Sequence, residues 1–259
     1  MKNQDNQITL SIITVVFNAE KQLEKTIRSI IDQEFKSYEH LVIDGGSTDG
    51  TVNIINAYSK HIKYWLSEPD NGIYDAMNKG LDASSGNWII FLNAGDEFYD
   101  NQVLNSIDFS VEARVIYGGY FSPECGAVNA RPISYLMYRM PSKHQSFIYK
   151  RSIIRYALNY KVASDYDYTL QHYKCFGKNN FLMLDRIICK YDEFGFSTSY
   201  PLRSAIEQLH IKRRSVGISL LDYFLTLQKL VINFLKKLFP RAYFKIRKYF
   251  FSTVLHSKK

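Results

Sequence analysis

The first hundred residues alternate between short apolar runs and segments in which apolar residues recur every three or four positions, and this alternation strongly constrains the fold. Leu23, Ile27 and Ile30 have the spacing of one helix face. Strand, helix and parallel strand in succession form a βαβ unit, so the pattern predicts an α/β fold with a mostly parallel sheet flanked by helices. The predicted strands are 9–17, 40–44, 62–67 and 87–93; the predicted helices are 19–32, a segment N-capped by Ser47 or Thr48 that runs to Tyr58, and 72–84.

The second hundred residues are less regular. Residues 114–121 and 180–192 are predicted as strands, and 164–176 as a helix. Acidic residues become rare after Tyr200-Pro201, which places a boundary there. We therefore predict one domain at 1–200, with halves at 1–100 and 101–200, followed by a tail at 201–259.

Composition excludes several classes of protein. With 259 residues, of which 46% are hydrophobic, the chain can bury a core, so a disordered or fibrous protein is excluded. Three cysteines without C-x-x-C spacing argue against a disulfide framework or structural zinc and fit a reducing compartment. The N-terminal apolar stretch spans only about nine residues without a small-residue cleavage site, so it is predicted as a strand and not a signal peptide. No run of 18 or more apolar residues predicts a membrane span.

The net charge of +8 is concentrated in the tail. Residues 201–259 contain 13 Lys and Arg against two acidic residues, a charge of +11, whereas residues 1–200 carry −3. An amphipathic basic helix with interleaved aromatics suits an anionic membrane surface, so we predict membrane contact through 216–251. The alternative is a helix packed on the domain or on a second copy in a homodimer. The predicted apolar face comprises Leu220, Phe224, Leu227, Val231, Leu235 and Leu238, and the predicted polar side comprises Asp222, Lys229, Asn233, Lys236 and Lys237.

Polar residues follow the predicted strands, at the edge where open α/β sheets bind ligands. They are Asn18, Asp44, Glu68 with Asp70, and Asn93 with Asp96. The turn at 44–50 has neither the G-x-G-x-x-G nor the P-loop spacing. An Asp beside glycines can accept hydrogen bonds from a base or ribose; the alternative is a plain turn in which Asp49 caps the next helix.

Four motifs together carry a resemblance. They are TVVFNAE at 14–20, VIDGGSTDGT at 42–51, SEPDNGIYDAMNKG at 67–80 and FLNAGDEF at 91–98. Their order and spacing resemble the nucleotide-sugar-binding half of family 2 glycosyltransferases, which have the GT-A fold. The resemblance is close over residues 8–100 and looser over 140–200.

The resemblance implies a nucleotide site on the matching positions. Asp44 takes the base-recognising place, and the segment around Asn71-Gly72 faces the diphosphate and ribose. This agrees with the residues themselves, because Asn-Gly permits an unusual turn and the following helix offers its N–H groups to an anion. Asn78 has a surface polar role as its alternative. The implied nucleotide-binding residues are Thr14, Val16, Asn18, Glu20, Asp44, Gly46, Ser47, Asp70, Asn71, Gly72 and Asn78.

The family's metal motif, usually Asp-x-Asp, is altered here to Asn93-Ala94-Gly95-Asp96. The resemblance implies Mg²⁺ or Mn²⁺ held mainly by Asp96, with Asn93 assisting, because hard cations take oxygen ligands. Asn93, Ala94 and Gly95 would also border the donor sugar. The alternative is that Asp96 only caps the following turn.

The family's catalytic base lies in an acidic motif that opens a helix, and residues 162–170 match it. Asp165 takes the position of the base, and Asp167 is the fallback. Without the resemblance, Asp165 would be interpreted as a helix cap or dipole partner. The preceding segment 141–147 implies that His144 and Gln145 contact the pyrophosphate or the acceptor. Lys143, His172 and His210 have no stronger claim than surface residues.

The resemblance thus implies an inverting, metal-assisted glycosyltransferase that moves a sugar, most often from UDP, to a hydroxyl of a lipid-linked or polysaccharide acceptor. Relatives of this type assemble bacterial surface polysaccharides, which implies a cytoplasmic enzyme, peripheral on the inner membrane. One alternative is a non-catalytic nucleotide-sugar-binding partner protein at the membrane. A nucleic-acid binder is disfavoured because no recognised DNA or RNA module is present.

Overall fold

The structure is a computed structural model that describes residues 8–191, 200–217, 219–220, 222–224, 226–228 and 230–231. The chain divides into two compact units, residues 1–195 and 196–259. The first unit contains a sheet flanked by helices, and the second contains helix α5 (Pro201–Ser215).

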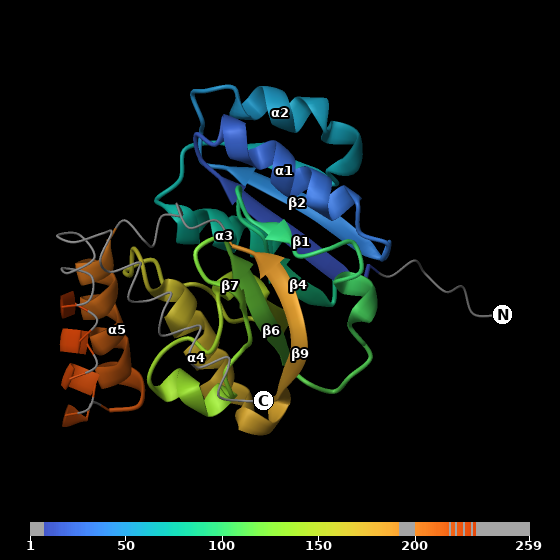
Figure 1. Ribbon diagram of the computed structural model, residues 1–259. Helices are drawn as coiled ribbons and strands as arrows, with labels where there is room; N and C mark the ends of the chain where they lie inside the picture. Colours follow the sequence, from blue (N-terminus) through green and yellow to red (C-terminus); the bar gives the residue numbers. More distant parts are fainter. Residues whose placement is uncertain are drawn as a thin grey trace. The chain divides into compact units, whose positions relative to one another are not determined.

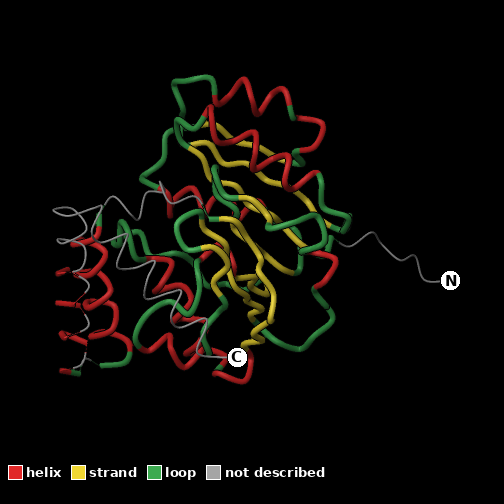
Figure 2. The backbone as a smooth tube through the Cα atoms, viewed as in Figure 1, coloured by secondary structure: helices red, strands yellow, loops and turns green. Residues whose placement is uncertain are grey.

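Four parallel strands, in the order β3-β2-β1-β4, form the first half of the sheet. Figure 2 shows the strands of the sheet in yellow and the helices in red. The β1 and β2 strands bury side chains on both faces, as expected when helices cover both sides of a parallel sheet. Their register sets Val16 opposite Asp44 and Asp44 opposite Ser67, so the carboxyl ends of three strands lie together. The predicted α/β fold is therefore confirmed. The strands are β1 (Leu10–Val16), β2 (Tyr38–Asp44), β3 (Tyr64–Ser67) and β4 (Trp88–Phe91).

The sheet continues into the second half of the unit through β8, which pairs antiparallel with β4. Beyond β8 the order is β6-β9-β5, and β7 pairs with β6. The strands predicted at 114–121 and 180–192 are confirmed as β6 and β9. These later strands are β5 (Glu97–Phe98), β6 (Val115–Ser122), β7 (Gly126–Val128), β8 (Phe147–Lys150) and β9 (Phe181–Lys190).

Helices cover both faces of the sheet (Figure 1). Leu23 and Ile27 of α1 are buried in a cluster with Val16 of β1, as their spacing predicts. On the other face, Met77 of α3 is buried with Ile13 of β1, in a cluster that α4 also joins. The helices are α1 (Glu20–Ile31), α2 (Thr51–Ala57), α3 (Ile73–Ala83) and α4 (Ser164–Phe176), and the 3₁₀ helices are η1 (Ser59–His61), η2 (Leu104–Ser106), η3 (Ile133–Met137), η4 (His144–Ser146) and η5 (Lys178–Asn180).

The start of α2 differs from the prediction. The helix begins at Thr51, so neither Ser47 nor Thr48 is its N-cap. The hydroxyl of Ser47 instead hydrogen-bonds the carboxylate of Asp44, and the N–H of Thr48 donates to the side chain of Asn18 at 2.8 Å. The turn is thus held by long-range partners that the local sequence does not reveal.

In the second unit, α5 is followed by helical residues up to Val231 within the described part. Leu220, Tyr223, Phe224 and Leu227 are all more than half exposed. Asp222, predicted on the polar side, is buried and pairs with Lys212 at 2.5 Å, which corrects that placement. The predicted positions from Asn233 to Leu238, and Lys229, lie outside the described residues. No helix among the described residues is long and apolar enough to cross a membrane.

Candidate active site

The turn after β2 is organised around Asp44. This side chain is fully buried, and its Oδ2 accepts hydrogen bonds from the Ser47 N–H at 2.9 Å and the Ser67 hydroxyl at 2.6 Å. Its Oδ1 accepts from the Ser47 hydroxyl. Burying a carboxylate is costly unless it is hydrogen-bonded, and these donors meet that requirement. In this structure Asp44 holds the turn in place, and its contact with a base stays a prediction.

The loop after β1 is tied to the same turn. Asn18 has a positive φ of 47°, and its backbone N–H donates to the Ser47 hydroxyl at 2.7 Å. Glu20 accepts a hydrogen bond from the Gly50 N–H at 3.2 Å, and the Glu20 N–H donates to Asp49 at 3.2 Å. The structure therefore brings together the predicted residues that follow the first two strands.

The turn between β3 and α3 lies against the turn after β2. A Cβ added to Gly45 would be 2.5 Å from Oδ2 of Asp70, so these two groups are in direct contact. Oδ1 of Asp70 accepts the Gly72 N–H at 2.7 Å, and Gly72 has φ of 110°, which favours glycine. The N–H of Asn71 donates to Asp75 at 3.0 Å. The unusual turn predicted at Asn71-Gly72 is confirmed.

Three further predicted nucleotide contacts lie within or beside the sheet. The Thr14 hydroxyl hydrogen-bonds Nε2 of His40 at 3.0 Å, and both residues are buried. Burial lowers the pKa of His40 to about 3, so this histidine is neutral at pH 7. The carbonyl of Val16 accepts the Gly45 N–H at 2.9 Å. Gly46 has φ of 82° and closes the turn.

Asn78 connects α3 with the second half of the unit. Its side-chain amide donates to the Tyr156 carbonyl at 3.0 Å and accepts the Tyr156 N–H at 2.9 Å. Both ends of the amide are therefore engaged by one backbone residue. The structure gives Asn78 a positioning role, and a direct nucleotide contact stays a prediction.

The segment after β4 forms a tight turn that ends in a buried carboxylate. The Asp96 N–H donates to the Asn93 carbonyl at 2.9 Å. Gly95, with φ of 103°, donates its N–H to the Thr26 hydroxyl at 2.9 Å, and that hydroxyl donates to the Asp96 carbonyl at 2.7 Å. The side chain of Gln145 donates to Oδ2 of Asp96 at 2.8 Å. Gln145 is thus placed to orient Asp96.

This corner offers oxygen atoms that fit a hard cation. Oδ1 of Asn93 is buried and has no hydrogen-bond partner among the described residues. Together with the Asp96 carboxylate it supplies the oxygen ligands that Mg²⁺ and Mn²⁺ accept. The described residues contain no cluster of three His, Cys, Asp or Glu side chains suited to a metal. The protein therefore fits a cation that takes its other ligands from water or a substrate phosphate.

His144 is a buried, neutral partner of Tyr156. Its Nε2 lies 2.6 Å from the Tyr156 hydroxyl, and its ring centre lies 5.4 Å from that of Phe91. Burial lowers the pKa of His144 to about 3. A neutral imidazole held in this way does not supply positive charge to a pyrophosphate at pH 7.

Asp165 occupies the first turn of α4. Its Oδ1 accepts the Tyr166 N–H at 2.8 Å and lies 3.5 Å from the Tyr74 hydroxyl. Burial raises the pKa of Asp165, although the Tyr166 N–H and the positive charge of Lys143 act in the opposite direction. A raised pKa strengthens a carboxylate as a proton acceptor. The fallback residue Asp167 accepts a hydrogen bond from Gln171 at 2.6 Å on the same helix.

Lys143 and Tyr156 are central to the site and were missed from the sequence. The ammonium nitrogen of Lys143 lies 3.8 Å from the ring centre of Tyr191, and its charge lowers the pKa of Asp165. Tyr156 stacks on Tyr168, with 4.1 Å between the ring centres. Its hydroxyl lies 2.6 Å from Nε2 of His144, and its backbone is hydrogen-bonded to Asn78. Tyr156 belongs to no motif, and Lys143 lies in segment 141–147 without a role assigned there; the contacts of both arise only when distant segments fold together.

The consecutive residues Lys143, His144 and Gln145 join the two halves. Lys143 interacts electrostatically with Asp165, whereas Gln145 hydrogen-bonds Asp96. One short segment therefore hydrogen-bonds the carboxylate after β4 and acts electrostatically on the carboxylate at the start of α4. The loop is thus linked to two carboxylates, those of Asp96 and Asp165.

Comparison with known sequences identifies related proteins. The family model described as "Glycosyl transferase family 2" matches residues 11–176. The PGL/p-HBAD biosynthesis glycosyltransferase of Mycobacterium tuberculosis is 29% identical over 202 residues, which cover 71% of this chain and 77% of that relative. A Bacillus subtilis protein named for teichuronic acid biosynthesis, glycosyltransferase TuaG, is 32% identical over 108 residues, which cover 40% of this chain and 42% of TuaG.

Solved structures share the fold. A fragment of S. aureus TarS in complex with UDP-GlcNAc superposes with a TM-score of 0.64 at 17% identity, covering 86% of this chain and 71% of that one. The chain spans 43% of a longer TarS structure. Glucosyl-3-phosphoglycerate synthase from Mycobacterium tuberculosis, in complex with Mn²⁺, UDP and its product, gives a TM-score of 0.57 at 13% identity over 82% of this chain and 80% of that one. The chain described here belongs to glycosyltransferase family 2 and is a transferase with the GT-A fold.

Proposed function

We propose that the protein transfers a sugar from a UDP-sugar to a hydroxyl group of a glycan or lipid-linked glycan, with inversion at the anomeric carbon. The observation that carries this proposal is the segment from Lys143 to Gln145, in which Gln145 hydrogen-bonds Asp96 and the charge of Lys143 acts on Asp165. A transferase of this kind needs one group near the leaving diphosphate and another near the attacking hydroxyl. The two carboxylates supply these functions.

The donor site is assigned to the carboxyl ends of β1 to β4. There the turns after β1, β2 and β3 contact one another through Asn18, Ser47 and the pair Gly45 and Asp70. Ligands of open α/β sheets bind at this edge. Structural neighbours with UDP or UDP-GlcNAc bound favour a uridine nucleotide as the donor carrier.

A divalent cation is assigned to the corner after β4. Asp96 and Oδ1 of Asn93 would hold Mg²⁺ or Mn²⁺, which neighbouring structures contain. When bound, the cation neutralises negative charge on the diphosphate leaving group. Gln145 keeps the Asp96 carboxylate oriented, and Thr26 fixes the backbone beneath it.

Asp165 is assigned the role of general base. Its carboxylate takes the proton of the acceptor hydroxyl while the hydroxyl oxygen forms a bond to the anomeric carbon. The bond from that carbon to the diphosphate oxygen breaks on the opposite face, so the configuration inverts. The raised pKa of Asp165 suits this step, because a stronger base accepts the proton more readily once it is ionised.

The name of a relative supports the proposed acceptor, and the surface of the second unit supports the proposed cellular location. TuaG is named for teichuronic acid biosynthesis, which supports a bacterial polysaccharide or its lipid-linked precursor as the acceptor. Leu220, Tyr223, Phe224, Leu227 and Val231 of the second unit are exposed, and the last turn of α5 is basic. These features support peripheral attachment to the cytoplasmic face of an anionic inner membrane, with a homodimer as the competing use.

A second function is favoured by one observation. Asn93 and Gly95 occupy places where the family usually has acidic residues, and this change is compatible with a nucleotide-sugar-binding protein that does not catalyse transfer. Slow hydrolysis of the UDP-sugar in excess Mn²⁺ distinguishes the two functions. A catalytic protein releases UDP, whereas a binding protein returns the donor intact.

The test is a thermal-shift panel of nucleoside diphosphates and their sugar conjugates, with and without Mn²⁺. A ligand that binds only the folded protein raises its melting temperature. We expect UDP or one UDP-sugar to raise it, and the shift to increase with Mn²⁺. If no nucleotide changes the melting temperature of folded protein, the proposed donor site is contradicted.

A further inference from the structure

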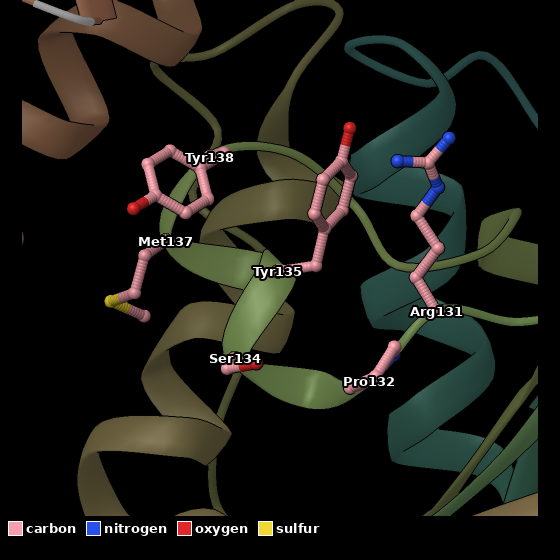
Figure 3. Close-up of a pocket in the computed structure, with 6 residues that line it drawn as sticks. All are labelled: Arg131, Pro132, Ser134, Tyr135, Met137 and Tyr138. Atoms are coloured by element: carbon pink, nitrogen blue, oxygen red, sulfur yellow. The ribbon is translucent and has the colours of Figure 1, made fainter.

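An open surface cavity of about 710 Å³ lies in the first unit, and its lining residues come from the segment between β7 and η4. Figure 3 shows that the side chains of Arg131 and Tyr135 project in the same direction from the η3 segment. No residue predicted to act in the reaction lines this cavity. Its lining residues are Arg131, Pro132, Ser134, Tyr135, Met137 and Tyr138.

The cavity combines aromatic surface with one positive charge. The guanidinium carbon of Arg131 lies 4.4 Å from the ring centre of Tyr135, and the ring centres of Tyr135 and Tyr138 are 6.2 Å apart. Tyr138 is 42% exposed. Among the described residues, no carboxylate forms an ion pair with Arg131. Its planar guanidinium can therefore bind an incoming carboxylate or phosphate in a bidentate manner.

The segment that lines the cavity is hydrogen-bonded to other parts of the second half of the first unit. The Arg131 N–H donates to the Pro141 carbonyl at 2.9 Å, and the Arg131 carbonyl accepts the Tyr117 hydroxyl at 3.1 Å. The Tyr166 hydroxyl donates to the Leu136 carbonyl at 2.9 Å. Tyr166 directly follows Asp165, the assigned base, so η3 is anchored to the helical turn that carries it.

The surrounding sequence has one sign of charge. Residues 125–164 contain seven Lys and Arg residues and no Asp or Glu. This segment includes the cavity and the loop with Lys143. Arg155 of this segment pairs with Asp82, and the remaining positive charges raise the local concentration of anionic ligands.

We propose that this cavity binds an anionic sugar unit of the acceptor, with a tyrosine ring against the sugar and Arg131 paired with its carboxylate or phosphate group. Aromatic faces pack against the apolar faces of sugar rings, and the guanidinium selects an acidic unit over a neutral one. The inference rests on the proposed transferase function and adds to it the chemical class of the acceptor. Anchoring of η3 to Tyr166 connects the bound unit to Asp165.

The test uses the full chain saturated with UDP and Mg²⁺, so that phosphate groups do not enter the donor site. Methyl β-D-glucuronide, glucose 6-phosphate and methyl β-D-glucoside are titrated by saturation-transfer NMR. The variant Arg131→Gln removes the charge. Arg114→Gln is the matched control, because Arg114 also lies over an aromatic ring, Phe176, at 5.3 Å, beside the opposite end of α4.

We expect one or both anionic sugars to bind at least about tenfold more tightly than the neutral glucoside. Arg131→Gln abolishes this preference, and Arg114→Gln keeps it. A preference for the glucuronide identifies a uronate, and a preference for glucose 6-phosphate identifies a phosphorylated sugar. Equal binding of all three sugars, or an unchanged preference in Arg131→Gln, overturns the inference. UDP binding by each variant is measured on the same sample, so loss of the donor site is distinguished from loss of the acceptor cavity.

Discussion

Two carboxylates of the first unit, those of Asp44 and Asp165, differ in how many hydrogen-bond donors surround them. Asp44 is buried and receives hydrogen bonds from Ser47 and Ser67. Asp165 is also desolvated, but its hydrogen bonds come from the adjacent N–H and from Tyr74 at 3.5 Å, and its pKa is raised. A carboxylate whose oxygens are held by several donors suits a fixed binding element. One that is poorly compensated suits proton transfer.

Asp96 gives the largest expected effect among variants of the donor side. Asp96→Asn keeps the size of the side chain but removes the charge assigned to cation binding, so we expect a loss of turnover above about 100-fold.

Gln145→Leu should lower turnover by about 10–100-fold, because the hydrogen-bond donor that orients Asp96 is absent. UDP release from the UDP-sugar is measured across a Mn²⁺ titration.

The control for these variants is Asp185→Asn, an exposed carboxylate on β9. It should retain full turnover. Normal turnover in Asp96→Asn at every Mn²⁺ concentration would remove Asp96 from the assigned role.

Asn78→Ala tests whether Asn78 acts by joining α3 to the Tyr156 backbone or by contacting the nucleotide. Asn78→Ala breaks both hydrogen bonds to the Tyr156 backbone, and we expect unfolding to become easier by about 2 kcal/mol. Urea denaturation measures this, with the exposed residue of α2, Asn53→Ala, as a control that changes stability by less than about 0.5 kcal/mol. UDP affinity of the folded variant should be unchanged. A large loss of UDP affinity with normal stability would instead make Asn78 a nucleotide contact.

Lys143 gives the smallest expected effect and sharpens the role of Asp165. Turnover requires ionised Asp165, so the rate falls as pH decreases through the pKa of that carboxyl group. The charge of Lys143 lowers this pKa, so Lys143→Met should move the acidic limb of the pH–rate profile to higher pH and leave the plateau unchanged. Lys143→Arg should keep the position of the limb. A loss of rate at all pH values, without movement of the limb, would contradict this role.

The first half of the first unit was largely predictable because its features are local. The β-branched runs and helical spacing predicted four parallel strands, and Asn71-Gly72 predicted an unusual turn, in which Gly72 has φ of 110°. The N-cap of α2 was mispredicted because Ser47 is engaged by Asn18 and Asp44. Short polar side chains favour both caps and turns, and only distant partners decide between these uses.

The second half of the first unit was less predictable because its contacts with the first half join distant positions. Tyr74 and Asp165 are 91 residues apart, and Asp96 and Gln145 are 49 residues apart. Lys143 looked like a surface residue because nothing in its sequence surroundings indicates the Tyr191 ring. A motif specifies a backbone turn through its own residues, whereas the protonation behaviour of a carboxylate depends on burial and charges that the fold brings together.

The assignment of binding to the first half and proton transfer to the second is tested most directly by Asp165→Asn. UDP affinity and UDP-sugar turnover are measured on the same preparation with saturating Mn²⁺, with Asp167→Asn for comparison. We expect Asp165→Asn to bind UDP within about twofold of the unaltered protein and to lose turnover by at least about 100-fold. Near-normal turnover in Asp165→Asn would contradict the assignment of Asp165 as the base.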